Sequence, residues 1–389
     1  MRRGLIVLAT ALALVLSCGA RASKTDLTAP LTKNGAKWRI GYMEGGVYGN
    51  YLWNLRALAL GLRKLGWIET PAEFERMHFR DEKELWEWLG ANAASRYLEF
   101  VQDAFWSAGW DKERRAVNKE EAIVRFNRDR DLDAVVAMGT WAGQDLANDL
   151  HTVPVLVLQS GNAVQSGIVK GAAYSGSPHV FAHCDPDRYK RQVRLFHNLV
   201  GFKKLGVAFE DTPHGRVYAA VDDVRDVCRQ LGVEVVECHT VTNTTDLSQA
   251  VESYRACHER LAGQVDAMYI TNSIVVKAET LPGLLEPFKA AKVPTFAQTG
   301  FDAVRWGALL SISQGDPRST GMFYARTLSQ VLHGVPAGDL PQVFEDTSHF
   351  GLNLDTAKAI GFDPPAGLLV AAEVVSSSPG SSPESGAAR

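Results

Sequence analysis

The chain has 389 residues, of which 46% are hydrophobic and 22% are charged. This length and composition exclude a single small module and a disordered or collagen-like chain. The formal net charge is only -3, from 41 Lys and Arg against 44 Asp and Glu, so the chain lacks the basic surplus of a nucleic-acid-binding protein. Five cysteines are too few for a scaffold built on disulfides.

The N-terminal segment 1–22 has the pattern of a secretory signal peptide. Two arginines precede an uncharged, mostly apolar run over 4–16 that is short for a membrane span. Two processing sites compete. Residues 15–18 resemble a bacterial lipobox, in which Cys18 would be acylated and become the mature N-terminus, whereas 20–22 fit ordinary signal peptidase. Both predict an exported protein, periplasmic or at the cell surface, and we favour a lipid anchor through Cys18.

Export places the remaining cysteines, Cys184, Cys228, Cys238 and Cys257, in an oxidising compartment. Four cysteines permit three pairings, and the sequence does not choose among them. We expect one or two structural disulfides or buried thiols. Three of these cysteines adjoin histidines, but the spacing is not that of a metal site, so we expect no metal.

The middle of the chain alternates short apolar runs with helical patterns. The first series predicts a strand at 38–43, a helix at 51–65, a strand at 133–138, a helix at 141–150 and a strand at 153–158. A Gly/Ser-rich passage at 160–178 follows. The second series predicts helices at 186–199, 216–231, 247–261 and up to about 291, and strands at 205–209, 233–236, 265–270 and 293–297. Such alternation predicts an α/β protein with two doubly wound parallel-sheet lobes.

Two segments do not follow the alternation. Residues 72–118 carry many charges and aromatic side chains, and their spacing predicts one or two amphipathic helices that pack as an insert on their own lobe. Residues 376–389 are rich in Ser, Pro, Gly and Ala, and we expect a disordered tail.

Catalytic motifs are missing from the sequence. We find no phosphate-binding or dinucleotide-binding glycine pattern, no nucleophile elbow and no zinc-protease helix motif. The sequence therefore predicts a binding protein rather than an enzyme, without a cofactor.

Candidate ligand-binding residues follow from the fold class. Ligands of open α/β sheets bind at the carboxyl ends of the strands, and two facing lobes would share one cleft there. Helix starts at Gly139-Thr140 and at 271–273 combine backbone N–H groups with hydroxyls, which suits an anion. Helix capping or core packing is the alternative for each position. The candidates are Tyr42, Glu44, Gly139, Thr140, Trp141, Asn162, Asp211, Thr271, Asn272, Ser273, Gln298 and Thr299, with the neighbouring 159–161 and 210–212.

Several segments, in this order, resemble a family of ABC-transporter solute-binding proteins of uncharacterised substrate, some of them associated with aromatic amino acids. They are DLDAVVAMGTWAGQDLAN (131–148), VPVL (153–156), KLGVAF (204–209), LGVEVVE (231–237), VDAMYITN (265–272), VPTFA (293–297) and NLDTAKAIGF (353–362). The resemblance runs from about Trp38 to Pro365, except for the insert at 72–118.

The resemblance implies a type I periplasmic-binding-protein fold with three interlobe crossovers and a hinged cleft. It implies a first lobe of 37–165 plus 301–335, with a strand at 308–312 and a helix at 321–332, and a second lobe of 166–300 plus 336–375. Three departures fall at the expected cleft. Trp141 replaces a proline, Gly161-Asn162 replace an Asp-Pro pair, and Gln298-Thr299 replace a Ser-Asp pair. An amino-acid ligand therefore does not carry over directly.

The expected function is an exported receptor that closes around a small solute and delivers it to an ABC permease. The solute would be an amino acid or another small carboxylate or aromatic compound, and we expect a monomer without a nucleic-acid partner. A ligand-sensing module for a membrane signalling partner is the alternative. An extracytoplasmic hydrolase would need Glu44 together with Glu210 or Asp211 in the cleft.

Overall fold

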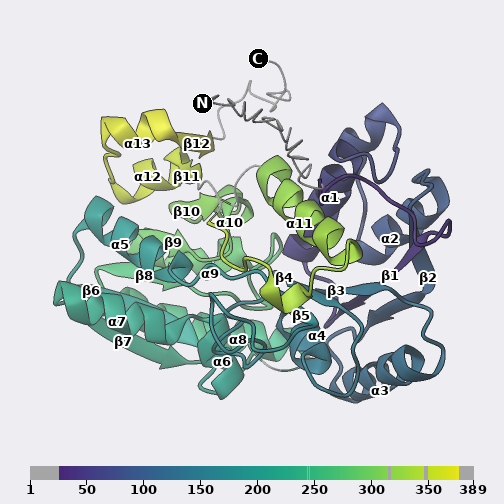
Figure 1. Cartoon of the computed structure of the whole chain (residues 1–389). Coiled ribbons are helices and arrows are strands. Elements are labelled where there is room, and N and C mark those ends of the chain that lie inside the picture. Colours follow the sequence, from purple (N-terminus) through teal and green to yellow (C-terminus); the bar gives the residue numbers. More distant parts are fainter. Residues whose placement is uncertain (1–25, 243, 245, 314–316, 346–348, 376–389) are drawn as a thin grey trace, which may run out of the picture.

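In a computed structural model of the chain, residues 26–242, 244, 246–313, 317–345 and 349–375 are described. The expected signal segment with Cys18 and the expected tail at 376–389 lie outside these residues. The described residues form two sheets, one of five and one of seven strands, and each sheet is the centre of one lobe. Figure 1 shows the two lobes side by side, the first mostly in purple and blue and the second mostly in teal and green, with its last elements in yellow.

The first sheet is parallel throughout. Its strands lie in the order β2 (Leu98–Ser107), β1 (Trp38–Glu44), β3 (Ala134–Met138), β4 (Val155–Leu158) and β5 (Val180–Ala182). Every residue of β3, β4 and β5 is buried. These strands read as continuous apolar runs because a parallel sheet of this kind is covered on both faces.

The second sheet contains the later strands. They lie in the order β12 (Ala372–Val375), β11 (His349–Asn353), β10 (Leu310–Ser313), β9 (Thr295–Ala297), β8 (Ala267–Ile270), β6 (Lys204–Phe209) and β7 (Glu234–His239). All neighbouring pairs are parallel except β10 with β11, which is antiparallel. The doubly wound α/β class expected from the sequence is therefore correct.

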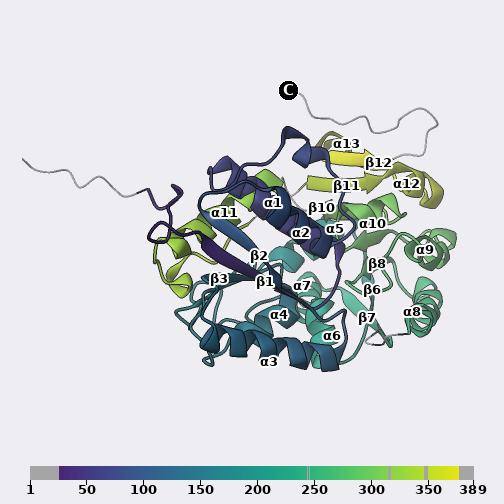
Figure 2. The same ribbon diagram turned by 90° about the vertical axis from the view of Figure 1, so that its right-hand side faces the viewer.

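Helices cover both sheets, as the two perpendicular views show (Figures 1 and 2). Those of the first lobe are α1 (Gly49–Lys64), η1 (Ala72–Arg76), α2 (Glu82–Asn92), α3 (Lys112–Arg128), α4 (Gly139–Leu146) and α11 (Pro317–Leu332). Those of the second lobe are α5 (Arg188–Val200), α6 (Pro213–Tyr218), α7 (Val221–Leu231), α8 (Leu247–Ala262), α9 (Leu281–Ala290), α10 (Phe301–Arg305), α12 (Leu354–Ile360) and α13 (Ala366–Ala371). A short helix, η2 (Ala337–Asp339), contacts β5.

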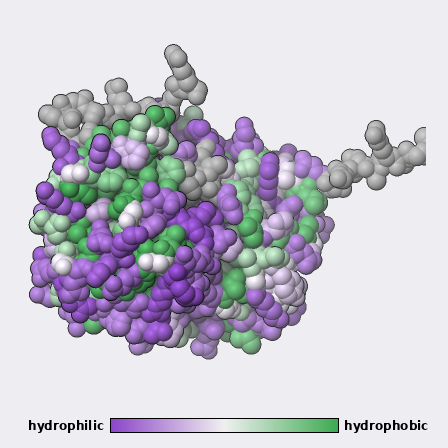
Figure 3. All heavy atoms as spheres, turned by 90° about the vertical axis from the view of Figure 1, so that its left-hand side faces the viewer, coloured by the Kyte–Doolittle hydropathy of each residue, from purple (hydrophilic) through white to green (hydrophobic). Residues whose placement is uncertain are grey.

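Each sheet has a separate apolar core on each of its faces. The core clusters around the first sheet share no residue with those around the second, so each lobe has a hydrophobic core of its own. Figure 3 views the side of the second lobe and shows hydrophilic side chains with apolar ones scattered between them.

The segment at 72–118 is not a helical insert. It contains η1, α2 and the edge strand β2, which pairs with β1, and it ends at the start of α3. The stripe of Trp86 and Leu89 on α2 is buried in the core, as expected. The aromatic residues Phe100 and Trp106, however, belong to β2, whose buried and exposed positions partly alternate. Charged residues on the exposed side of this edge strand gave it the composition of an amphipathic helix.

Two strands lie in the other lobe from the one expected. The strand expected at 308–312 in the first lobe is β10, which pairs with β9 and β11 in the second sheet. Residues 180–182, placed in the second lobe, form β5 of the first sheet. Buried strands of both sheets share the same apolar pattern, so the sequence alone does not assign them. The helix expected at 321–332 does lie on the first lobe, as α11 against α1.

The helix expected at 216–231 is divided into α6 and α7. The break occurs at Ala220, whose φ of 51° lies in the left-handed region. A left-handed residue ends the run of helical hydrogen bonds, so the chain changes direction between the two helices. Tyr218 thereby stands at the end of α6 rather than within a long helix.

Two connections between the lobes run side by side. The backbone N–H of Cys184 donates to the carbonyl of Gln342 at 2.9 Å, and that of Phe344 donates to the carbonyl of Cys184 at 3.2 Å. The buried side chain of Gln342 accepts from the N–H of Ala182 at 3.3 Å and donates to the carbonyl of Gly171 at 3.0 Å. These connections are thus tied to each other and to the first lobe.

The four described cysteines form one disulfide rather than two. Cys238 on β7 and Cys257 on α8 form a disulfide, while Cys184 and Cys228 are buried thiols. Burial raises the pKa of both thiols to about 11, which keeps them protonated at neutral pH.

Within the described residues, no group of three or more His, Cys, Asp or Glu side chains could hold a metal ion. No helix in this part of the chain is long and apolar enough to cross a membrane.

Candidate functional site

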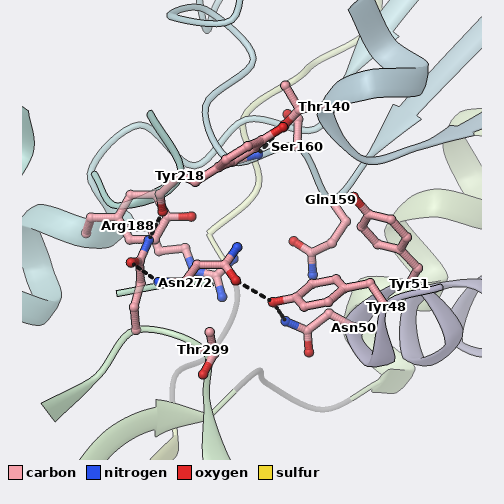
Figure 4. A pocket seen from close by; sticks show the side chains of 13 residues that line it. Tyr48, Asn50, Tyr51, Thr140, Gln159, Ser160, Arg188, Tyr218, Asn272 and Thr299 are labelled. Atoms are coloured by element: carbon pink, nitrogen blue, oxygen red, sulfur yellow. Dashed lines mark hydrogen bonds between the residues drawn. The ribbon is translucent and has the colours of Figure 1, made fainter. Parts of the chain in front are cut away.

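A cavity lies between the two lobes, where the carboxyl ends of strands from both sheets meet. It encloses about 460 Å³ of space free of protein atoms, part of it open to solvent. The first lobe lines it with Tyr48, Asn50, Tyr51, Thr140, Gln159, Ser160 and Gly161, and the second with Arg188, Tyr189, Tyr218, Asn272, Gln298 and Thr299 (Figure 4).

One wall of the cavity is the start of α1. Tyr48 and Tyr51 pack edge to face, with ring centroids 5.1 Å apart. The fully buried Glu82 of α2 accepts the backbone N–H of Tyr48 at 3.2 Å, so α2 fixes the point at which α1 begins. Burial raises the pKa of the Tyr48 hydroxyl to about 12, so this group is a neutral hydrogen-bonding group at any ordinary pH.

The second wall in the first lobe follows β3 and β4. Gly139 has a φ of 85°, and a Cβ at this position would overlap the Tyr51 hydroxyl. Glycine is therefore needed at the turn from β3 into α4. The Thr140 hydroxyl at the start of α4 accepts the N–H of Gly161 at 3.2 Å, which joins the ends of the two strands. The positive end of the α4 dipole thus lies beside the cavity.

In the second lobe, Gln298 organises the wall. This residue follows β9 and is buried. Its Oε1 accepts the N–H of Asn272 at 2.9 Å, and its Nε2 donates to the carbonyl of Tyr218 at 2.7 Å. One side chain therefore holds the end of β8 and the end of α6 in place around the cavity.

The lobes touch across the cavity. The Tyr48 hydroxyl of the first lobe donates to Oδ1 of Asn272 in the second lobe at 3.3 Å, and it accepts from the Asn50 amide at 3.2 Å. Figure 4 shows this chain of polar groups crossing the cavity. Tyr218 also hydrogen-bonds to the side chain of Trp141 in the first lobe. The site therefore needs both lobes to be complete.

Four of the residues expected from the sequence line the cavity: Thr140, Asn272, Gln298 and Thr299. Each follows the carboxyl end of a strand, as the fold class requires. Gln159, Ser160 and Gly161, in the expected 159–161 segment, join them.

The other candidates lie elsewhere. Tyr42 is fully buried in the first lobe, where its hydroxyl donates to Glu44 at 2.8 Å and its ring stacks on Phe105. Glu44 also accepts from the Ser107 hydroxyl at 2.8 Å. Gly139 adjoins the cavity beneath Tyr51. These three positions support the wall from behind.

Trp141 turns toward α3, where the Arg115 guanidinium lies 4.6 Å from its ring. Asn162 accepts the backbone N–H groups of Val164 and Gln165 and caps its own turn. Capping explains this residue, as the alternative reading anticipated.

The remaining candidates belong to the second lobe. Asp211 is exposed and pairs with Arg216 at 2.6 Å. Thr271 is buried and donates to the carbonyl of Ala208 at 2.7 Å, while Ser273 accepts the N–H of Val275 at 3.4 Å. Glu44 and Asp211 thus have separate partners, and neither lines the cavity. Glu210 does not line the cavity either, so among the described residues the expected pairing of Glu44 with Glu210 or Asp211 is not found there.

Sequence reasoning missed six lining residues: Tyr48, Asn50, Tyr51, Arg188, Tyr189 and Tyr218. They lie at or beside helix ends rather than directly after strands. No local sequence signal identifies them, because only the folded arrangement of the lobes brings these side chains together.

Comparison with known proteins agrees with this architecture. A family model described as ABC transporter substrate binding protein matches residues 109–376, which is more than half of the chain. A curated relative, the tyrosine-binding protein of Clostridioides difficile (strain R20291), is 25% identical over 230 residues, or 59% of this chain. The match spans 63% of that relative, which is less than two thirds of its length.

Solved structures share the fold. The ABC domain in complex with L-Trp from Streptococcus pneumonia has a TM-score of 0.64 at 18% identity, over 87% of this chain and 99% of that chain. The ligand-free, open structure of a substrate-binding protein with adhesive properties from Clostridium difficile has a TM-score of 0.61 at 19% identity, with the same coverage. Two α/β lobes around a cavity, together with the family match, lead to one conclusion: the chain belongs to the ABC transporter substrate-binding protein family.

Proposed function

We propose that this protein is an extracytoplasmic receptor that captures a small solute between its lobes and delivers it to an ABC permease. The observation that carries the proposal is the cavity, which is lined from both lobes at the carboxyl ends of their strands. A solute bound there would contact both lobes at once, so binding energy would favour their closure. A closed, loaded form is what a permease could distinguish from an empty one.

The lining supports an aromatic or other small planar solute. Four tyrosines surround the cavity, and aromatic rings offer large contact areas for stacking. The relatives whose printed names mention tyrosine or L-Trp bind aromatic compounds, which is consistent with such a ligand. We further propose that the mature protein is a monomer, anchored outside the cytoplasmic membrane by a lipid on Cys18.

The proposal is tested by a thermal-shift panel of amino acids, nucleosides, sugars and small organic anions. We expect at least one class to raise the melting temperature, because a ligand that binds only the folded state stabilises it by mass action. Absence of a shift with every class would contradict solute capture.

A variant links any shift to the cavity. Tyr48→Phe removes only the hydroxyl that crosses between the lobes, and we expect affinity to fall about two- to twelvefold, as for one hydrogen bond of about 0.5–1.5 kcal/mol. Tyr174→Phe is the matched control, because Tyr174 is exposed and does not line the cavity. Equal losses in both variants would place the binding site elsewhere.

A further inference from the structure

Among the described residues, the side chains that line the cavity include a positive charge but no negative one. Among the described residues that line it, Arg188 alone is charged at neutral pH, and the others are tyrosines, amides, hydroxyl residues and one glycine. No carboxylate lines the cavity in this part of the chain. The formal charge of the lining is therefore positive, whereas that of the whole chain is -3.

The carboxylates of nearby segments are held by other groups. Glu44 accepts from Tyr42 and Ser107 inside the first lobe. Asp211 pairs with Arg216, and Asp185 pairs with Arg191 at 2.6 Å. None of these carboxylates lines the cavity, so no acidic side chain of a described residue is available there to pair with a ligand cation.

Arg188 is the first residue of α5, and the charge of its guanidinium is available to pair with a ligand. Its guanidinium makes no ion pair and no hydrogen bond with a described residue. It is half-buried and lies 5.7 Å from the ring of Tyr189. Burial raises the pKa of the Tyr48 hydroxyl, whereas the charge of Arg188 lowers it. The electrostatic effect of Arg188 therefore extends across the cavity to the wall formed by the first lobe. A partly desolvated guanidinium without a partner is suited to a planar carboxylate.

Two of the polar acceptors that line the cavity are already engaged. Gln298 uses both ends of its amide within the wall. Oδ1 of Asn272 accepts from Tyr48. An ammonium group in this cavity would lose water without gaining a carboxylate from any described residue, and burial of an unpaired charge is costly. The positive end of α4 beside Thr140 adds to the penalty.

From this arrangement, and resting on the proposed function, we infer that the cleft selects an aromatic monocarboxylate without an α-ammonium group. Arg188 is the residue that pairs with the carboxylate, and the ring lies among Tyr48, Tyr51, Tyr189 and Tyr218. Arg188 thereby determines specificity for an acid over the corresponding amino acid.

Three phenols test this inference by titration calorimetry on the whole protein: 3-(4-hydroxyphenyl)propionate, L-tyrosine and tyramine. They share a 4-hydroxyphenylethyl skeleton and carry a carboxylate, both a carboxylate and an ammonium group, or an ammonium group alone. We expect the propionate to bind at least about tenfold more tightly than L-tyrosine and tyramine to bind least, because an unpaired ammonium costs more than 1.4 kcal/mol. L-tyrosine binding equally well or better would overturn the inference and leave solute capture intact. Binding of none of the three would also overturn it, whereas solute capture itself fails only if the wider panel gives no shift.

Arg188→Gln should reduce propionate affinity at least tenfold and bring it close to that of L-tyrosine. Arg188→Lys, which keeps the charge, should recover part of the loss. Arg194→Gln is the matched control, because Arg194 lies on the same helix but hydrogen-bonds to Gln230 on the surface. Folding of each variant is checked by its melting temperature without ligand. Unchanged selectivity in Arg188→Gln would contradict the role assigned to this residue.

Discussion

Glu44 is the residue whose surroundings have the clearest consequence for pH. Burial, followed by the nearby Glu82, raises its pKa from the ordinary 4.5 to about 7, although hydrogen bonds from Ser107 and Tyr42 oppose the shift. The pKa of Glu82 is raised as well, mainly by burial. Glu82 in turn holds the N–H of Tyr48 at the cavity. The two carboxyls therefore connect the protonation state of the first lobe to the wall of the site.

The sign of the pH effect follows from proton binding. Between pH 4.5 and about 7 the folded state holds the Glu44 proton more tightly than the unfolded state does, so stability falls as pH rises. Glu44→Gln imitates the protonated form. As the pH rises from 5 to 8, we expect its free energy of unfolding to increase by up to about 3 kcal/mol relative to that of the natural protein. Urea unfolding at both pH values measures this. Glu121→Gln, at an exposed position on α3, is the control, and an equal gain there would contradict the assignment.

At the level of residues, the sequence predicted the part of the site that follows strands. Thr140, Asn272, Gln298 and Thr299 come directly after or close to strand ends, where the fold class places ligands. Tyr48 and Arg188 reach the cavity from helix starts, and their positions depend on how helices pack across lobes. Local patterns do not contain that information, so these residues could not be predicted.

At the level of elements, the contact between α1 and α11 is unusually close. Gly61 and Gly321 face each other, and a Cβ added at Gly61 would overlap the carbonyl of Gly321. A Cβ at Gly321 would likewise overlap the carbonyl of Ala57. Both positions lie within helices, where alanine would otherwise be favoured. Close packing, rather than backbone conformation, therefore requires glycine at this crossing.

Gly61→Ala should lower stability by about 1–3 kcal/mol, because the helices must separate to admit the methyl group. Gly283→Ala is the matched control, because Gly283 lies in α9 and a Cβ there meets nothing within 4 Å. For this variant helix propensity predicts a gain in stability of up to about 1 kcal/mol. Denaturant midpoints of the two variants measure the difference. A neutral Gly61→Ala would mean that the two helices are less tightly packed than described.

The elements predicted correctly are those with long or fully buried patterns, such as α1, α8, β3 and β6. The missed strands are β2, β5, β11 and β12. Of these, β5 and β12 contain three and four residues, and β2 and β12 are edge strands with exposed polar positions. Short or half-exposed strands carry too few periodic positions to be distinguished from loops or helices.

For the whole molecule, the balance between open and closed forms depends on few contacts across the cleft. The hydrogen bonds from Tyr48 to Asn272, at 3.3 Å, and between Tyr218 and Trp141 join neutral groups, and each such bond contributes about 1 kcal/mol. A contribution of this size does not hold two separate lobes together against their conformational freedom. We therefore expect the ligand-free protein to be open for much of the time.

Small-angle scattering tests this expectation. Adding a compound that raises the melting temperature in the panel should reduce the radius of gyration, because the solute contacts both lobes. The same compound should leave the radius of gyration of Arg188→Gln unchanged at a concentration well below the raised dissociation constant of this variant. An unchanged radius in the natural protein at saturation would contradict closure on binding.

The position of α11 has a consequence for the order of folding. The hydroxyl of Tyr324 in α11 donates to Asn54 in α1 at 3.0 Å, across a sequence separation of 270 residues. Contacts over such separations form late, because a long loop must close before they stabilise anything. The apolar face of α1 is therefore covered only by a helix that is synthesised after most of the second lobe. During synthesis the first lobe stays incomplete until α11 has emerged, so interruption of the chain before α11 leaves its core uncovered and prone to aggregation.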